Sequence, residues 1–368
     1  MRIFFFLLLA LHALIHLLGF VKAFNLAEVG QLTQSISKSA GAAWLLASIF
    51  LLAGAVLFLL KFECWWLAAA PGVILSQVLI FTSWTDAKFG TIANVLILLP
   101  LLISILNSLP SSFANVYKAE VRKGLARSAS TPLVQEAEIA PLPAPVQKYL
   151  RNAGVIGKPH VWNMRVRGAG QIRTKIDGGW LDFESQQYNF FDNPSRLYFI
   201  QSSMYGLPFD GLHAYVGPEA TMRIKVAAMF LVVDAKGAEM NRGETVTMFN
   251  DMCVMAPATL ISKSIQWESF DSLTAKATFT NVGNTISATL FFNESGELVN
   301  FTSDDRYLSE DGKVYKSYRW STPLKDYRDF GGTRIASYGE ASWKMPEGEF
   351  VYGKFTIRDV EYNCETLK

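Results

Sequence analysis

The chain has 368 residues and a formal net charge of +2, with 34 Lys and Arg against 32 Asp and Glu. Length alone favours about two domains, and the balanced charge excludes the broad basic field on which nucleic-acid-binding proteins depend. Three cysteines, Cys64, Cys253 and Cys364, form no C-x-x-C pair, which argues against a zinc site or a disulfide framework. Cys253 and Cys364 would pair only in an exported domain. We therefore expect no nucleic-acid partner, no metal and no cofactor.

Four apolar stretches occupy the first third of the chain. A membrane-spanning helix needs about 20 mostly apolar residues, and residues 3–21, 41–60, 65–84 and 89–109 meet this requirement. Short polar segments separate them. The sequence thus predicts a multi-pass domain of four transmembrane helices over residues 1–110, in contact with membrane lipids.

Lysine and arginine beside the apolar stretches predict the orientation of the chain. Arg2, Lys61 and the basic residues of 118–127 fall on one side, against three lysines on the other. The positive-inside rule then places both termini, and the rest of the chain, in the cytoplasm. As an alternative, the first stretch is a signal peptide cleaved after Val21-Lys22-Ala23. Cleavage would leave the later residues on the same side.

Two of the four histidines lie in the first apolar stretch. His12 and His16 are four residues apart and share one helix face. In the predicted topology Gln77 and Asn94 lie at a similar depth, so these four side chains form a candidate intramembrane polar cluster. One interpretation is interhelical hydrogen bonding, and the other is a metal ligand or proton relay. Two histidines on one helix do not bind one haem from opposite faces, which argues against haem.

Residues 111–144 predict a basic flank followed by an Ala/Pro-rich linker, because "STPLVQEAEIAPLPAPVQ" has no sustained period. The segment "APVQKYLRNAG" then predicts a short helix, with Pro145 near its start and Gly154 after its end. The basic residues suit an anionic membrane surface.

Alternation of apolar and polar residues marks the remainder of the chain. Strands are predicted in "HVWNMRVRG", "LTAKATFT", "TISATLFF", "ELVNFTS", "RIASYG", "EASWKM" and "EFVYGKFTIRDVEY". One helix interrupts them at "NRGETVTMFNDMCVM", with a capping box from Asn241 to Glu244. Residues 145–368 therefore predict an α+β domain dominated by curved antiparallel sheet, after the α-helical membrane bundle.

Such a sheet leaves a concave side when its helices cover the other face. Aromatic residues crowd one segment of the domain, and apolar, aromatic walls are typical of ligand pockets. They are also typical of an ordinary core. The candidate ligand-binding residues are Tyr188, Phe190, Tyr198, Tyr205 and Phe209.

Two charged motifs, "SDDRY" and "DYRDFGG", contain acid–base candidates, because paired carboxylates beside arginine can differ in pKa. These residues are Asp304, Asp305, Arg306, Asp326 and Arg328. The alternative is surface ion pairs. His160 and His213 are candidate general bases, but no Ser or Cys nucleophile motif accompanies them.

Several segments resemble, over nearly the whole chain, a bacterial membrane-anchored family of unknown function: "LHALIHLLGFVKAF", "SQVLIFTSWTDAKFGTIAN", "LPAPVQKYLRNAG", "GELVNFTSDDRY" and "DYRDFGGTRIASYGEASWKMPEGEF". The resemblance implies the bacterial inner membrane and carries no assigned chemistry. The later part of the chain is also similar, in strand order and aromatic content, to the half-barrels of LolA-like lipoprotein carriers. This second resemblance implies a concave face for acyl chains, although those carriers are periplasmic.

Two functions follow as expectations. The first is a membrane protein whose β-rich domain binds a hydrophobic or lipid-like ligand at the membrane surface. The alternative is a membrane-associated enzyme that uses an Asp/Arg cluster on a lipid-like substrate. A third hypothesis gives His12 and His16 a role in handling protons or metal. The sequence names neither the ligand nor the oligomeric state.

Overall fold

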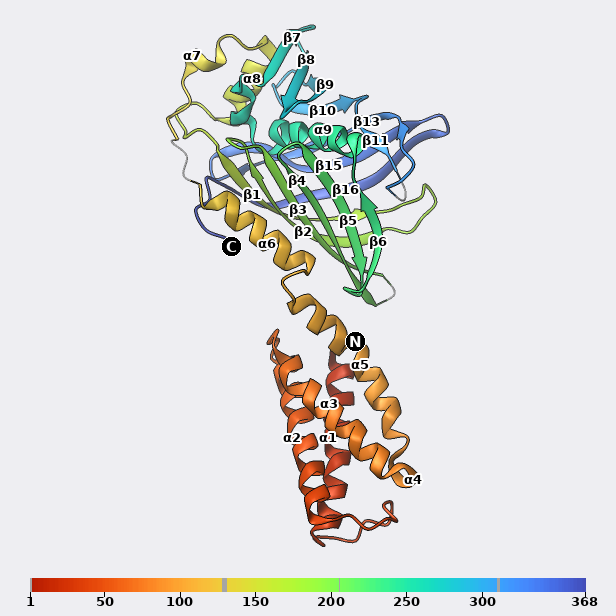
Figure 1. Cartoon of the computed structure of the whole chain (residues 1–368). Helices are drawn as coiled ribbons and strands as arrows, with labels where there is room; N and C mark the ends of the chain where they lie inside the picture. The colour runs from red at the N-terminus through yellow and green to blue at the C-terminus, as the bar shows by residue number, and fades with distance from the viewer. Residues whose placement is uncertain (1, 128–130, 205, 310–311) are drawn as a thin grey trace. The chain divides into compact units, whose positions relative to one another are not determined.

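The computed structural model describes residues 2–127, 131–204, 206–309 and 312–368 (Figure 1). The chain divides into two compact units, Met1–Leu109 and Pro110–Lys368. The division lies where the sequence changes from continuously apolar to mixed and charged. We call the second unit the β-rich unit.

Four long helices form the first unit, α1 (Arg2–Ala23), α2 (Lys38–Leu59), α3 (Trp65–Thr82) and α5 (Gly90–Ser108), with the short α4 (Trp84–Ala87) before the last. Among the described residues, four helical regions are long and apolar enough to cross a membrane, namely α1, α2, α3 and Gly90–Leu125, which begins with α5. Helices suit such sequences because every backbone polar group is satisfied within the segment. The predicted α-helical bundle of four apolar helices is confirmed.

Glycines allow the helices of the first unit to approach closely. A Cβ atom on Gly19 of α1 would lie 2.3 Å from the indole ring of Trp44 on α2. A Cβ atom on Gly54 of α2 would lie 2.8 Å from the side chain of Ala69 on α3. Small residues at helix contacts are typical of bundles in lipid, where van der Waals packing holds helices together. Larger side chains at these glycines would separate the helices.

The β-rich unit contains helices, one 3₁₀ helix and strands. The helices are α6 (Phe113–Leu125), α7 (Glu136–Ile139), α8 (Ala144–Ala153), α9 (Ala238–Met255) and the 3₁₀ helix η1 (Pro257–Ile261). The strands are β1 (Asn163–Ile172), β2 (Leu181–Phe190), β3 (Ser195–Met204), β4 (Leu207–Val216), β5 (Glu219–Val226), β6 (Phe230–Ala235), β7 (Ile265–Ser269), β8 (Thr274–Asn281), β9 (Asn284–Phe292), β10 (Leu298–Ser303), β11 (Tyr307–Leu308), β12 (Lys316–Ser317), β13 (Arg319–Ser321), β14 (Leu324–Phe330), β15 (Thr333–Met345) and β16 (Gly348–Tyr362).

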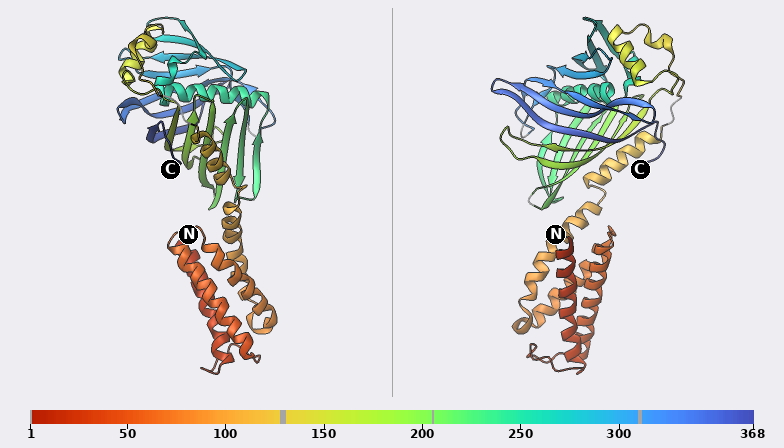
Figure 2. Two further views of the ribbon diagram at one scale, coloured as in Figure 1. Left: turned by 60° about the vertical axis from the view of Figure 1, so that its left-hand side comes forward. Right: turned by 180° about the vertical axis from the view of Figure 1, so that it is seen from behind.

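One large antiparallel sheet dominates this unit. In the described part of the chain its order is β6-β5-β4-β3-β2-β1-β16-β15-β13-β10-β9-β8-β7, and β14 pairs with β15. Strand β16 joins the two halves, because it pairs with β1 on one side and with β15 on the other. The sheet is strongly curved (Figure 2), as the twist of neighbouring strands favours. The predicted curved antiparallel sheet is confirmed.

Helix α9 lies along the inner face of this curved sheet (Figures 1 and 2). It contacts β5 in one half of the sheet and β8, β9 and β10 in the other. Its residues from Gly243 to Met255 are all buried. The stripe of Val246, Phe249 and Cys253 joins the main core, where Phe249 stacks on Phe279 with ring centroids 5.1 Å apart. The concave side that the sequence offers to a ligand is therefore occupied by α9.

Helix α6 packs on the opposite face of strands β2, β3 and β4. Phe113, Tyr117 and Val121 are spaced four residues apart and share a buried cluster with Tyr188 and Phe190. The sequence predicts a basic flank and linker over 111–144, and the structure differs here. The apolar stripe of α6 lies among the basic side chains of 118–127, so the sequence alone gives only a weak amphipathic pattern. The pattern is explained by the strands on which the stripe packs.

Two further elements differ from the sequence prediction. Helix α9 begins at Ala238 with Gly237 as its N-cap, three residues before the capping box expected at Asn241. The Asn241 side chain instead accepts a hydrogen bond from the Ala220 backbone, and Glu244 is buried. The two strands expected at "RIASYG" and "EASWKM" are one strand, β15, because Gly339 continues its pairing with Phe355 of β16.

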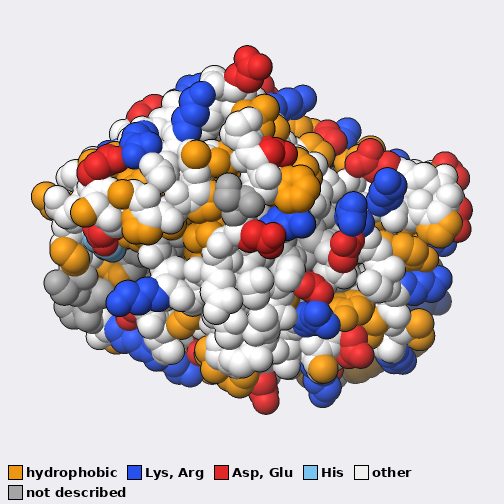
Figure 3. Space-filling model, turned by 90° about the horizontal axis from the view of Figure 1, so that it is seen from above, with side chains coloured by type: hydrophobic (Ala, Val, Ile, Leu, Met, Phe, Trp, Pro, Cys, Tyr) orange, Lys and Arg blue, Asp and Glu red, His pale blue; other side chains and the backbone are white. Residues whose placement is uncertain are grey.

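Charges of both signs mix on the surface. On the face seen in Figure 3, Lys and Arg side chains alternate with Asp and Glu side chains, and no large area has a single sign. This agrees with the near-balance of charge in the sequence.

Candidate functional site

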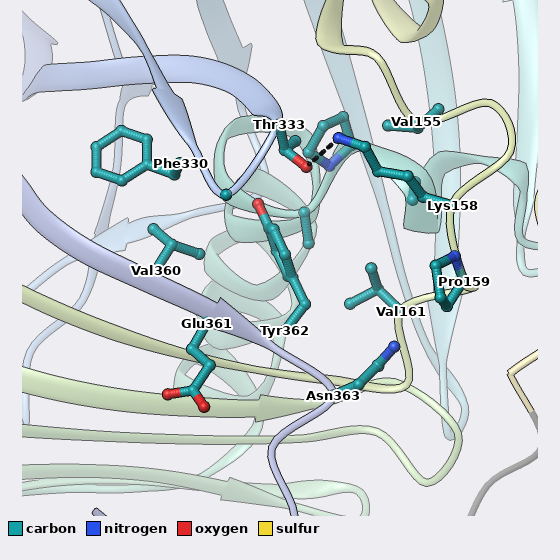
Figure 4. Close-up of a pocket in the computed structure, with 14 residues that line it drawn as sticks. Val155, Lys158, Pro159, Val161, Phe330, Thr333, Val360, Glu361, Tyr362 and Asn363 are labelled. Atoms are coloured by element: carbon teal, nitrogen blue, oxygen red, sulfur yellow. Dashed lines mark hydrogen bonds between the residues drawn. The ribbon is translucent and has the colours of Figure 1, made fainter.

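A pocket of about 410 Å³ lies in the β-rich unit. Four separate segments line it, namely residues 155–161 before β1, residues 256–258 where α9 meets η1, residues 330–333 between β14 and β15, and residues 360–363 at the end of β16 (Figure 4). The volume falls within the range of about 300–1,000 Å³ that is typical of small-molecule sites.

The walls of this pocket are largely apolar. Val155, Val161, Phe330 and Val360 contribute to them, together with Ala258 at the start of η1. A few polar groups gathered among apolar walls are typical of ligand sites, because the walls hold the ligand and the polar groups orient it.

The polar groups of the pocket gather where Lys158, Thr333 and Tyr362 meet (Figure 4). The Lys158 Nζ donates hydrogen bonds to the Gly332 carbonyl and, at 3.3 Å, to Thr333 Oγ1. The Tyr362 hydroxyl donates to the Met255 carbonyl at the end of α9. The pocket therefore has one polar corner and an apolar remainder.

Lys158 has no carboxylate within ion-pair distance among the described residues. Burial lowers the pKa of Lys158, and the charge of the more distant Asp329 partly opposes this shift. Glu361 also lines the pocket, but its carboxylate already pairs with Arg165 at 3.3 Å and with Lys368 at 2.5 Å. In Figure 4 the Glu361 carboxylate points away from Lys158. A half-buried cation thus faces the pocket without a matching anion.

A second polar cluster holds α9 against the sheet, and we call it the α9 network. Arg196 of β3 is its centre, with Nε 2.6 Å from Asp251 Oδ2 and Nη1 3.1 Å from Glu244 Oε2. Gln187 and Asn189 of β2 donate hydrogen bonds to the same Asp251 oxygen, at 2.6 and 3.0 Å. All five side chains are buried. Such charges are tolerated in a protein interior only when they are paired and hydrogen-bonded.

Two more basic side chains face Glu244, His213 from β4 and Arg306 from the segment between β10 and β11. His213 Nδ1 of β4 lies 3.6 Å from Glu244 Oε1, just beyond hydrogen-bond distance, and Arg306 Nη2 lies 3.9 Å from the same oxygen. Arg306 Nε also donates to Thr247 Oγ1 on α9. Burial alone would raise the pKa of Glu244, but Arg196, His213 and Arg306 outweigh it and lower that pKa to about 2. Glu244 is therefore held as a carboxylate.

The first unit contains a polar cluster of its own. His12 Nε2 lies 2.9 Å from Asn94 Oδ1 and 3.1 Å from Ser76 Oγ. Asn94 Nδ2 donates to Ser76 Oγ and to Gln77 Oε1. Side-chain hydrogen bonds thus join three of the four predicted residues and add Ser76, which lies one residue before Gln77. The ring of the fourth, His16, packs edge-on against that of His12, with centroids 4.6 Å apart. These contacts link α1, α3 and α5 at about 0.6 kcal/mol for each hydrogen bond, by comparison with other bundles.

His16 differs from His12 in its partners. Its Nδ1 contacts the His12 carbonyl on the same helix, so this contact links no second helix. Its Nε2 is buried without a hydrogen-bond partner in the described part of the chain. Its ring packs against Trp44, with centroids 5.0 Å apart. Within the described ranges, His12 is thus the one of the two histidines that makes hydrogen bonds between helices.

A family model described as a family of unknown function, DUF6544, matches residues 132–355. The chain belongs to this family. The match covers more than half of the chain, and it includes α9, the α9 network and much of the pocket. The resemblance to a family of unknown function that the sequence motifs indicate is confirmed. Comparison with curated proteins found no match.

Three solved structures are similar to part of this DUF6544 member. One is a lipoprotein-sorting protein domain from Vibrio parahaemolyticus, with 7% identity, TM-score 0.34, and coverage of 56% of this chain and 87% of that one. A DUF1329-family protein from Desulfovibrio piger has 10% identity, TM-score 0.36, and coverage of 61% and 94%. A LolA-superfamily protein from Nitrosomonas europaea has 11% identity, TM-score 0.33, and coverage of 60% and 94%. At these TM-scores the likenesses are distant.

The predicted acid–base residues of this DUF6544 member lie in separate environments. Asp304 forms an exposed ion pair with Arg319, and Asp305 pairs with Arg242 at 2.5 Å. Arg306 instead belongs to the α9 network. Asp326 and Arg328 lie on β14, which pairs with β15. The geometry therefore gathers no acid and base from these motifs into one site.

None of the four predicted aromatic ligand residues that the structure describes lines the pocket. Tyr188 and Phe190 are buried beneath α6, on the face opposite α9. Tyr198 lies over Arg196 of the α9 network, 4.9 Å from the guanidinium carbon to the ring centroid. Phe209 is half-buried on β4. Tyr205 lies outside the described residues.

No cluster of three or more His, Cys, Asp or Glu side chains suited to a metal ion occurs in the described ranges. Of the two candidate bases, His160 Nε2 lies 3.1 Å from Glu138 Oε1 near the surface, and His213 faces the buried Glu244. The three cysteines are all free thiols. Because it faces Glu244, His213 belongs to the α9 network.

Sequence reasoning missed the pocket and most of the α9 network. One signal was present, because Glu244, Thr247 and Asp251 recur at helical spacing on α9 and form a polar stripe opposite Phe249. The pocket left no such signal. Its lining comes from four segments that are far apart in the sequence.

Proposed function

We propose that the β-rich unit binds a hydrophobic or lipid-like ligand in the pocket described above. The observation that carries the proposal is the amphipathic lining, with apolar walls from Val155, Val161, Phe330 and Val360 and a polar corner at Lys158 and Thr333. An apolar molecule gains about 25 cal/mol for each Å² of surface that it removes from water. A ligand with one polar end would satisfy both parts of the lining.

Replacing Val161 with tryptophan is expected to fill the pocket and to exclude its ligand. Full-length wild-type and Val161→Trp proteins, purified alike from membranes, would be extracted and their lipids identified by mass spectrometry. Lipids held by the four apolar helices are common to both proteins, so a species lost from the variant belongs to the pocket. We expect that species to fall by about tenfold, which corresponds to about 1.4 kcal/mol of binding free energy.

Val216→Trp is the matched control, because Val216 is an exposed valine on β4 that does not line the pocket. It should leave the lipid profile unchanged. Identical profiles for all three proteins, with folding intact, would remove the proposal.

The proposed place of action is the membrane surface. The four apolar helices suit a bilayer and are covalently joined to the β-rich unit. The edge strand β6 also exposes three consecutive apolar residues, Phe230, Leu231 and Val232. In water, exposed apolar residues on an edge strand promote pairing with the strands of other molecules and hence aggregation. A lipid surface would cover these residues.

We further propose that the chain lies in the bacterial inner membrane with the β-rich unit in the cytoplasm. The basic residues beside the helices support this orientation through the positive-inside rule. A reporter fused after Lys368 distinguishes the compartments. Green fluorescent protein should be fluorescent there and alkaline phosphatase inactive, and the reverse pattern would contradict the orientation while leaving the ligand proposal standing.

A further inference from the structure

The choice of ligand rests on the charge at the polar corner of the pocket. Lys158 is half-buried, and its described hydrogen bonds go to the Gly332 carbonyl and the Thr333 hydroxyl, which are both neutral. The pocket's own carboxylate, on Glu361, is neutralised by Arg165 and Lys368. At one end the lining therefore presents an ammonium group with no described carboxylate within ion-pair distance, since Asp329 lies farther away, and elsewhere it presents apolar walls.

From this arrangement we propose that the pocket is specific for an anionic amphiphile, one with a single apolar chain and a carboxylate or phosphate headgroup beside Lys158. The inference rests on the proposed function and adds the charge of the ligand to it. The apolar chain of the ligand would lie along Val161, Phe330 and Val360. Its headgroup would accept hydrogen bonds from the Lys158 ammonium and the Thr333 hydroxyl. Charge-assisted hydrogen bonds are about twice as strong as neutral ones.

Partial burial strengthens this preference. Away from water, an ammonium and an anion attract each other more strongly than they do on an open surface. Burial already lowers the pKa of Lys158, because desolvation destabilises the charged ammonium. An adjacent anion would stabilise the ammonium again. A neutral headgroup would leave the ammonium with the two neutral partners that it already has.

The occupant is taken to be an amphiphile and not a free anion, because the polar corner occupies only a part of the lining. Val155, Val161, Phe330 and Val360 would gain nothing from inorganic phosphate. A segment of protein would require a more extended groove with backbone hydrogen-bonding partners. An apolar pocket with one cation suits a chain with a single charged end.

The test uses the full-length protein in phosphatidylcholine nanodiscs and three photoreactive probes that share one sixteen-carbon chain: a carboxylic acid, a phosphate monoester and an alcohol. After irradiation, labelled peptides are counted by mass spectrometry. Labelling of peptides from the four apolar helices serves as the internal reference for each probe's concentration in the bilayer. Peptides that contain Val161 or Val360 report the pocket.

In the wild-type protein we expect the anionic probes to label pocket peptides about tenfold more than the alcohol does. Lys158→Met should abolish this preference while labelling by the alcohol persists. Lys158→Arg keeps the charge and should retain much of the preference, which separates loss of charge from loss of folding. Comparison of the acid with the phosphate monoester identifies the headgroup.

Lys148→Met is the matched control. Lys148 on α8 also donates to a backbone carbonyl, that of Glu294, but it does not line the pocket. Equal labelling by the alcohol and both anionic probes in the wild type would overturn the charge preference and leave the proposed function intact. Absence of pocket labelling by every probe would instead contradict the proposed function itself.

Discussion

Replacing Arg196 with methionine is expected to lower the free energy of unfolding of the β-rich unit by about 3–5 kcal/mol, the usual cost of breaking a buried ion pair. Methionine has a similar length, so the space stays filled while the charge is lost. Asp251 and Glu244 would then be buried without their principal counter-ion. The cost arises from these unpaired carboxylates and not from a cavity.

Arg319→Met is the matched control for this variant. Arg319 also pairs with a carboxylate, that of Asp304, but both side chains are more than half exposed. Exposed pairs contribute about 0–1 kcal/mol. Thermal unfolding of the detergent-solubilised full chain, followed by intrinsic tryptophan fluorescence, should therefore separate the two variants clearly. Similar losses for both would contradict the role assigned to burial.

A compensated variant tests the mechanism more closely. Adding Glu244→Gln and Asp251→Asn to Arg196→Met removes the two carboxylate charges that the loss of Arg196 leaves unpaired. We expect the triple variant to be more stable than Arg196→Met alone, because uncharged amides cost less to bury than unpaired carboxylates. If the triple variant is the least stable of all, packing and not charge governs this part of the structure.

Acid is expected to weaken the β-rich unit through Glu244. The network lowers the pKa of this carboxylate to about 2, whereas an unfolded glutamate titrates near 4.3. Because the folded-state pKa is the lower one, the stabilisation is present in full above about pH 4.3 and is lost as the pH falls through the folded value. Between pH 6 and pH 3 the loss from this one group is about 2 kcal/mol.

Comparison with Glu244→Gln isolates that contribution, since other carboxylates titrate alike in both proteins. The difference in unfolding free energy between wild type and variant, measured by urea unfolding, should shrink by about 2 kcal/mol from pH 6 to pH 3. For Asp304→Asn the corresponding difference should change little, because solvent screens that exposed pair. A constant difference for Glu244→Gln would refute the linkage.

The α9 network also bears on the proposed ligand site. Asp251 and Glu244 anchor α9 to strands β2 and β3, and α9 leads directly into η1, where Ala258 forms part of the pocket wall. Tyr362 of the pocket donates its hydroxyl hydrogen bond to the last residue of α9. The position of this wall therefore depends on the position of the helix.

Local patterns in the sequence were sufficient for much of the fold. Continuous apolar runs identified the four long helices, and alternation identified β8, β9, β10 and β16, because both patterns reflect burial by immediate neighbours. The short helix α8 was recognisable from Pro145 and Gly154, which satisfy the rules for helix ends. Depth along the predicted helices placed His16 level with Gln77 and Asn94, and His12 one turn deeper, whereas in the structure it is His12 that contacts Asn94.

Other elements required knowledge of what packs on them. Tyr117 and Val121 predict a helix only once the strands beneath α6 supply an apolar surface. Glu244 has the spacing of a helix cap, and only the positions of Arg196 and His213 show why it is buried. Aromatic residues such as Tyr188 alternate with polar residues along a strand. This alternation does not determine which face of the sheet packs against α6 and which packs against α9.

Hydropathy and alternation therefore determined the class of each segment: apolar helices first, then a β-rich unit. Only the tertiary structure decided that α9 would occupy the inner face of the sheet, that Arg306 would join a buried network while Asp304 stayed on the surface, and that Lys158 would meet Thr333 and Tyr362. The physical reason is that secondary structure depends on neighbours within a few residues. A pocket or a buried ion pair depends on contacts between segments that are distant in the chain and become neighbours only after the sheet has closed around its helix.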